Sequence, residues 1–359
     1  MGSLPSSSRP SENFLCNYHI CVVFCPREPT SSGCVTNWIE LFNPSINTWT
    51  DVGSIPGLMD DQVLKGFSMV FLRDSIYIIG GQVCHKERVH VSDDIADWVD
   101  VGVQVVPTVL RYDFQSSQWS SCAPLGVARY DFACTVCEDK IYVAGGKSML
   151  ASARGISSAE VYDPNTDTWT TLPNLRILRY KCVGVTWQGK VHVIGGFAER
   201  EDSDRTVPSL VERSSGEVYN TKEEKWDLKV GMWQLDVPPN QIVEVNETLL
   251  SSGDCLNAWK GQVEAFDGKL WNEVDGSRKQ SLSTLEANQR LYLTMAPIRS
   301  ELYFLAGYGT VGGQEAGRTT SVVHIFDTSA TGDAWRSFEP MEVEGERELC
   351  GHCCVVQLS

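Results

Sequence analysis

The stretch KIYVAGGKSMLASARGISSAEVYDPNTDTWTTLP, residues 140–173, decides the fold because its features recur along the chain. It places an apolar run before two glycines, Gly145 and Gly146, and then an aromatic residue, a Pro-Asn turn and Trp169. The same order of apolar run and glycines returns strongly at Gly80, Gly81, Gly195 and Gly196, and more weakly at Gly253-Asp254 and Ala306-Gly307. A recurring unit of this length is typical of repeat architectures.

Tryptophan is the second repeated feature. An aromatic residue followed by Asp or Asn precedes a tryptophan six times, at intervals of 45 to 70 residues. Each unit reads as four short strands separated by Gly, Pro, Asn and Asp turns, and no stretch has the sustained apolar stripe of a helix. The sequence therefore predicts an all-β chain with six units. The six tryptophans are Trp49, Trp119, Trp169, Trp226, Trp271 and Trp335.

Paired glycines, then a tyrosine and a tryptophan, in repeats of about 50 residues resemble the kelch pattern. The resemblance covers almost the whole chain and implies a β-propeller, in which four-stranded sheets stack around an axis. In this fold the glycines permit positive φ where backbones crowd, and the aromatic residues fill the space between blades. The Tyr-Asp-Pro-x-Thr-x-x-Trp turn is closest in style to plant F-box/kelch-repeat proteins.

The two ends of the chain read as complementary parts of one blade. RELCGHCCVVQL, near the C-terminus, reads as a first strand, whereas FLCNYHICVVF, near the N-terminus, reads as a second strand. We therefore expect a six-bladed ring that is closed when the last strand joins the first blade. Residues 1–12 are expected to be a disordered tail and 13–359 the propeller, with blade 1 split between about 13–53 and 347–358.

Closure would also gather cysteines into blade 1 and create a redox-sensitive spot. We expect Cys16, Cys21 and Cys25 to lie near the cysteines of the last strand, which are Cys350, Cys353 and Cys354.

Charge and composition narrow the class of partner. The net charge is −16 and the pI is near 4.8, which argues against binding to duplex nucleic acid or, by charge, to an anionic membrane. No transmembrane run and no secretory signal are visible. We expect a cytoplasmic or nuclear protein whose thirteen cysteines are reduced. Gly2 and Ser6 match the outline of an N-myristoylation site.

No catalytic constellation is apparent. The six histidines are scattered, and Cys134-x-x-Cys137 and Cys350-x-x-Cys353 lie on expected strands, where residues three apart point to opposite faces. We therefore expect no cofactor, no metal site and no enzyme. A small-molecule-binding or enzymatic propeller that uses its axial pocket remains the alternative.

Arginines occupy one repeated position. Counting sixteen residues back from the first glycine of a pair gives Arg129 and Arg179, and the same offset from Ala306 gives Arg290. The resemblance implies that these arginines line one face of the ring and bind a partner, although hydrogen bonding between blades would equally explain the repeat. The full set of predicted partner-binding residues is Arg129, Tyr130, Arg179, Tyr180, Arg290, Arg347 and Trp98. Trp98 lies in an insertion at about 82–108, which we expect to be a long loop that contacts the partner.

The resulting hypothesis is a non-enzymatic propeller that binds another protein. In the plant group an F-box links such a propeller to a ubiquitin ligase, and the propeller selects the protein to be degraded. Only about a dozen residues precede the first expected strand, fewer than an F-box requires. We therefore expect this chain to lack an F-box and to supply only the recognition part of ubiquitin-dependent degradation.

Overall fold

The computed structural model describes most of the chain, and every structural statement below concerns the described part. This part is almost entirely β-structure, with one short helix, α1 (Leu210–Arg213). None of its helices is long or apolar enough to span a membrane. The described residues are 17–29, 34–92, 95–199, 210–256, 259, 261–274, 289–309, 318–331 and 333–358.

Six antiparallel sheets of four or five strands follow one another along the described chain. Sheet 1 contains β1 (Tyr18–Pro26), β2 (Trp38–Asn43), β3 (Thr48–Ser54), β30 (Arg347–Leu349) and β31 (Cys354–Gln357). Sheet 2 contains β5 (Ser68–Leu72), β6 (Ser75–Ile79), β9 (Val109–Asp113) and β10 (Gln118–Ser121). Sheet 3 contains β11 (Ala133–Cys137), β12 (Lys140–Ala144), β13 (Ala159–Asp163) and β14 (Thr168–Leu172).

The remaining three large sheets have the same up-and-down order. Sheet 4 contains β16 (Val183–Trp187), β17 (Lys190–Ile194), β19 (Gly216–Asn220) and β20 (Lys225–Lys229). Sheet 5 contains β21 (Ile242–Val245), β22 (Thr248–Ser251), β23 (Glu264–Phe266) and β24 (Trp271–Glu273). Sheet 6 contains β25 (Gln289–Ile298), β26 (Glu301–Gly309), β27 (Arg318–Asp327), β28 (Trp335–Ser337) and β29 (Met341–Glu344).

Two smaller sheets are added to this plan. One joins β4 (Gln62–Lys65) to a hairpin of β7 (Gln82–Ser92) and β8 (Ile95–Val105). The other pairs β15 (Leu178–Tyr180) with β18 (Phe197–Glu199). The prediction of a loop at about 82–108 was wrong for most of its length, because β7 and β8 cover residues 82–92 and 95–105. Residues 99–105 alternate valine with polar residues or glycine, which was an available strand signal, and β7 pairs with both β4 and β8.

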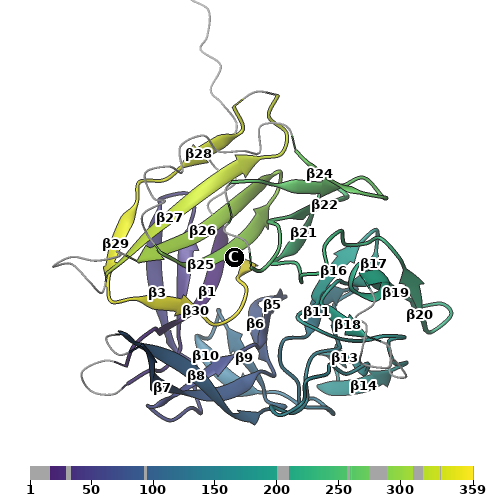
Figure 1. Ribbon diagram of the computed structural model, residues 1–359, viewed down its shortest axis with the longest axis horizontal. Helices are drawn as coiled ribbons and strands as arrows, with labels where there is room; N and C mark the ends of the chain where they lie inside the picture. The colour runs from purple at the N-terminus through teal and green to yellow at the C-terminus, as the bar shows by residue number, and fades with distance from the viewer. Residues whose placement is uncertain are drawn as a thin grey trace, which may run out of the picture.

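The sheets surround the middle of the molecule, toward which their first strands face (Figure 1). These strands contact one another in the order β5, β11, β16, β21, β25 and β31, and β31 contacts β5 in turn. Each of the six apolar clusters lies mainly between two neighbouring sheets; one joins sheet 6 to sheet 1 and another joins sheet 1 to sheet 2. The core is therefore distributed between sheets rather than placed within a single layer.

Strands from the two ends of the described chain pair within sheet 1. Phe24 of β1 lies opposite Leu349 of β30, and Cys21 lies opposite Cys354 of β31. Between these two pairs, the C-terminal segment advances five residues while β1 advances only three. The expected single C-terminal strand is therefore interrupted around Gly351. The prediction that Cys350 and Cys353 lie within one strand was wrong, because the segment between them leaves the regular register.

The repeated tryptophans form the same contact in each large sheet. Each pairs across two strands with the aromatic residue at the start of its motif, at ring-centroid distances of 5.0 to 5.3 Å. The indole N–H of Trp169 also donates to the carbonyl of Ala123, just beyond sheet 2, at 2.9 Å. The equivalent bond runs from Trp226 to Pro173 at 2.8 Å. These tryptophans thus link consecutive sheets both by packing and by a hydrogen bond.

The glycines of the three strong pairs have positive φ, as expected, whereas Gly307 of a weak copy does not. Two of the paired glycines lie against backbone of the next repeat. A Cβ on Gly80 would be 2.6 Å from the carbonyl oxygen of Arg129, and one on Gly145 would be 2.7 Å from that of Arg179. A side chain is excluded at both positions by conformation and by space.

We expect Gly145→Ala to lower the free energy of unfolding by about 3 kcal/mol or more, since left-handed strain and overpacking add. Gly189→Ala is the matched control, because Gly189 has φ of 67° against 69° for Gly145 but nothing within 4 Å of its added Cβ. The control should cost only about 1 kcal/mol. Urea unfolding of both variants measures the difference, and equal losses would refute the role of the close backbone approach.

Candidate functional site

Arg129 and Arg179 are fully buried, with 0% of each residue exposed. The Arg129 guanidinium donates to the carbonyls of Gly145 and Ser158 at 2.8 and 2.9 Å, and to the carboxylate of Glu160 at 2.7 Å. Arg179 repeats this arrangement with its own sheet, where it donates to Gly195, Ser215 and Glu217.

The backbone of each arginine bonds to the preceding sheet. The carbonyl of Arg129 accepts from the N–H of Gly81, and that of Arg179 accepts from Gly146, both at 2.8 Å. Each arginine therefore joins two sheets, and the sixteen-residue spacing exists because its guanidinium reaches the first glycine of its own repeat. Their assignment to a partner-binding face stays a prediction. The terminal guanidinium nitrogens of both arginines donate to groups within the protein, and these bonds position the segments that carry Tyr130 and Tyr180.

Arg347 and Arg290 occupy other surroundings. Arg347 is 3% exposed; it donates to Glu40 at 2.9 Å and to Ser321 at 2.6 Å, which joins sheet 1 to sheet 6. Its guanidinium also lies 4.3 Å from the ring centre of Phe24. Arg290, on β25, is partly exposed and lies opposite Tyr308. Arg129, Arg179 and Arg347 thus each join two neighbouring sheets, whereas Arg290 is partly exposed.

A row of two packed aromatic rings with a cation at each end lies beside the buried arginines. The Lys147 Nζ lies 4.5 Å from the centre of the Tyr180 ring, Tyr180 packs on Phe197 at 5.1 Å, and Arg213 lies 5.5 Å from the centre of Phe197. All four side chains are partly exposed. We call Lys147, Tyr180, Phe197 and Arg213 the Tyr180 row. Tyr130 is next to it but only 7% exposed, and its backbone pairs with Lys147.

Sequence reasoning found Tyr180 but missed its three neighbours. Lys147 and Phe197 each follow directly after a glycine pair, so the position after the pair was an available signal. Arg213 had none, because it reaches the row through α1, at the end of an insertion. The segment 200–209 of that insertion lies outside the described residues, as do Cys16, Gly2 and the predicted tail.

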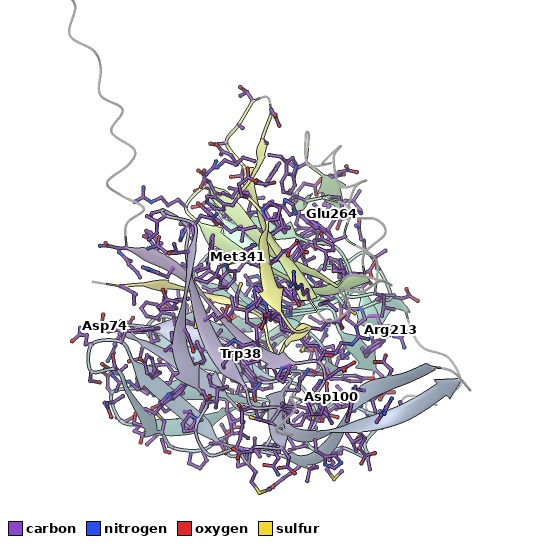
Figure 2. The ribbon with its side chains drawn as sticks, turned by 90° about the vertical axis from the view of Figure 1, so that its left-hand side faces the viewer. Trp38, Asp74, Asp100, Arg213, Glu264 and Met341 are labelled. Carbon is purple, nitrogen blue, oxygen red and sulfur yellow. The ribbon has the colours of Figure 1, made fainter. Side chains whose placement is uncertain are left out.

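The hairpin of β7 and β8 extends from the same side of the molecule as the Tyr180 row. Figure 2 places Arg213 toward the side on which the hairpin near Asp100 protrudes, and Asp74 toward the opposite side. We call the side with Arg213 and the hairpin the entrance face. Trp98, on β8, is partly exposed there, and Val99 and Val103 are 38% and 49% exposed.

Four charged side chains fix the base of the hairpin. Lys65 and Lys86 each lie within 3.2 Å of both Asp100 and Glu348, and the Lys86 side chain is 1% exposed. Burial alone would raise the pKa of Asp100, but the two lysines together hold it below its ordinary value. The insertion is therefore an arm that ion pairs secure to Glu348 of sheet 1.

A cavity of about 710 Å³ lies among the first strands of the sheets, a size that fits a small ligand. Its wall includes Lys65, Asp131 and several thiols. Burial raises the pKa of Cys134 and Cys353 to about 12 and that of Cys182 to about 11. These thiols stay protonated near neutral pH and are poor nucleophiles. Among the described residues, no group of three or more metal-ligating side chains occurs.

The chain is similar in sequence to known kelch-repeat proteins. A family model described as the Kelch motif matches residues 128–176. Three similar curated proteins, all from Arabidopsis thaliana, are named F-box/kelch-repeat proteins. One is 30% identical over 75% of this chain and 66% of its own length. A second, SKIP30, is 26% identical over 93% and 79%. A third is 39% identical over 70% and 58%, so the chain spans only part of each relative.

Proposed function

The chain belongs to the kelch-repeat family related to plant F-box/kelch-repeat proteins, and on this premise we propose that it is a closed six-bladed propeller that binds another protein through its entrance face. In this proposal the propeller is not an enzyme. The bound protein is a target for ubiquitin-dependent degradation in the cytoplasm or nucleus.

Three features support the closed ring of six blades. The first strands contact one another in a circle from β5 to β31 and back to β5. The apolar clusters lie between successive sheets, including the pair formed by sheets 6 and 1. Strands β30 and β31 pair with β1, and such pairing covers an edge that would otherwise promote aggregation.

The Tyr180 row is the single observation that carries the binding proposal. It places two cations and two aromatic rings, partly exposed, on a protein of net charge −16. Tyrosine and arginine are frequent hot spots because they combine apolar area with hydrogen bonding. The buried hydrogen bonds of Arg129 and Arg179 hold the strands below the row in place. The row is therefore preorganised, and little conformational entropy is lost when a partner binds.

Binding is tested with a triple variant of the row, Lys147→Ala with Tyr180→Ala and Arg213→Ala. The amount of each partner recovered from source cells should be at least tenfold lower with this variant than with the wild-type protein. The reason is that truncating a hot-spot residue costs about 2 kcal/mol or more of binding free energy. The identified partner is then measured with purified components by titration calorimetry.

The control variant is Asp74→Ala, which changes a surface residue on the opposite side (Figure 2). It should bind like the wild type. Undiminished affinity of a folded triple variant, checked by circular dichroism, would remove the Tyr180 row from the binding face.

A further inference from the structure

Four cysteines meet where the first strand pairs with the last strands. Cys21 lies directly opposite Cys354 in the register of β1 and β31. The backbone N–H of Cys350 donates to the carbonyl of Val23 at 3.0 Å, and Cys25 lies two residues further along β1, on the same face as Val23. The thiols of Cys25 and Cys350 are hydrogen-bonded to each other. The expected clustering of cysteines is therefore present for these four residues.

The Cys25–Cys350 pair differs from the Cys21–Cys354 pair in its charged surroundings. Lys65 and Lys86 lie close enough to act on the Cys25 thiol, and both are held in place by Asp100 and Glu348. The hydrogen bond from Cys350, together with the two lysines, outweighs burial and lowers the pKa of Cys25. Burial raises the pKa of Cys350, so Cys350 remains the thiol donor while Cys25 gains thiolate character.

The pair is buried, yet one of its members borders open space. Cys25 and Cys350 are 0% and 4% exposed, which excludes large reagents. Cys350 and Lys65 nevertheless form part of the wall of the 710 Å³ cavity. A molecule as small as hydrogen peroxide can approach the pair from the cavity, whereas a protein oxidant cannot.

We propose that Cys25 and Cys350 are a modification site, a dithiol that peroxide oxidises to a disulfide and so joins the first and last strands covalently. The Cys25 thiolate attacks one peroxide oxygen, the O–O bond breaks, and water leaves after protonation. The Cys350 sulfur then attacks the sulfenic acid on Cys25, which forms the S–S bond and releases a second water. Two thiols and one hydrogen peroxide thus give one disulfide and two waters, and two electrons pass from sulfur to oxygen.

This disulfide would stabilise the folded protein. It would close a loop from residue 25 to residue 350, almost the whole chain, and the entropy removed from the unfolded state grows with loop length. We expect an increase in Tm of roughly 5 °C or more after mild oxidation, which a reductant such as dithiothreitol reverses. Disulfides in reducing compartments are usually of this transient, redox-sensing kind.

In the test, the folded 359-residue chain is treated with hydrogen peroxide, and its free thiols are then blocked with iodoacetamide. Linked tryptic peptides are mapped by mass spectrometry without reduction. The expected result is a Cys25–Cys350 linked peptide that forms before any sulfinic acid. Cys25→Ala and Cys350→Ala should each abolish the rise in Tm, whereas Cys21→Ala should retain it.

Three outcomes would overturn the proposal. These are a Cys21–Cys354 linkage in place of the expected one, a Cys25–Cys350 linkage that forms only in urea, and sulfinic acid on Cys25 without any disulfide. Peptide mapping of the wild-type protein decides among them even when an alanine variant fails to fold.

Discussion

Replacing Arg129 with alanine is expected to lower the free energy of unfolding by about 3–5 kcal/mol, because the change leaves a buried carboxylate without its cation. Glu160 is 3% exposed and would keep only the N–H groups of Gly126 and Val127, at 2.7 and 3.2 Å. The carbonyls of Gly145 and Ser158 would lose a donor at the same time. Urea unfolding followed by tryptophan fluorescence measures the loss.

Arg111→Ala is the matched control for this prediction. Arg111 also pairs with a carboxylate, that of Asp113 at 3.0 Å, but its side chain is 41% exposed. Solvent screens such a pair, so the control should change stability by less than about 1 kcal/mol. Arg129→Lys should behave almost like the alanine variant, since one ammonium cannot replace several directed N–H donors. If Arg129→Ala were no worse than Arg111→Ala, the arginine would not hold neighbouring sheets together.

Deleting residues 347–359 is expected to leave the protein unfolded or insoluble. The deletion removes β30 and β31, which pair along one edge of β1 while β2 pairs along the other, and with them Arg347, which bonds to Glu40 and Ser321. It also takes Val356 out of the cluster between sheets 1 and 2. An unpaired, apolar β1 edge would then pair with other molecules. Size-exclusion chromatography and circular dichroism measure the result.

Two point variants test whether the buried side chain of Val356 accounts for the stabilising effect of β31. Val356 is 0% exposed, so Val356→Asp would bury an uncompensated charge and should reproduce much of the damage. Gln357 is exposed, and Gln357→Ala should be tolerated. A folded and monomeric truncated protein would contradict the proposal that β31 closes the ring.

The architecture was predicted from short sequence motifs, which can be recognised without knowing which distant residues are in contact. A glycine pair, an aromatic residue and a tryptophan at a fixed distance specify a hairpin and its turn, because both strands of the hairpin are local in sequence. The tryptophan contacts at 5.0 to 5.3 Å and the positive φ of the glycines agree with that reasoning. The pairing of the N-terminal and C-terminal strands was also predicted from local patterns, because one segment reads as the first strand of a blade and the other as the second strand.

The candidate site was less accessible to this reasoning. The sixteen-residue spacing located Arg129 and Arg179, but not the direction of their side chains. That direction depends on Ser158 and Glu160 for Arg129, about thirty residues away. Within the Tyr180 row, Arg213 was missed for a similar reason, since α1 brings it to Phe197 across an insertion whose path the sequence does not indicate.

By itself, the sequence determined the repeat, the number of tryptophan units and the all-β class, since each of these follows from side-chain periodicity and turn chemistry over a few residues. Only the tertiary structure decided which arginines are buried, that ion pairs secure the hairpin after Gly81 to sheet 1, and that Cys25 meets Cys350 beside two lysines. These outcomes depend on contacts between residues far apart in the chain. Burial and charge pairing at such contacts are set by how the sheets pack, and local pattern carries no record of that packing.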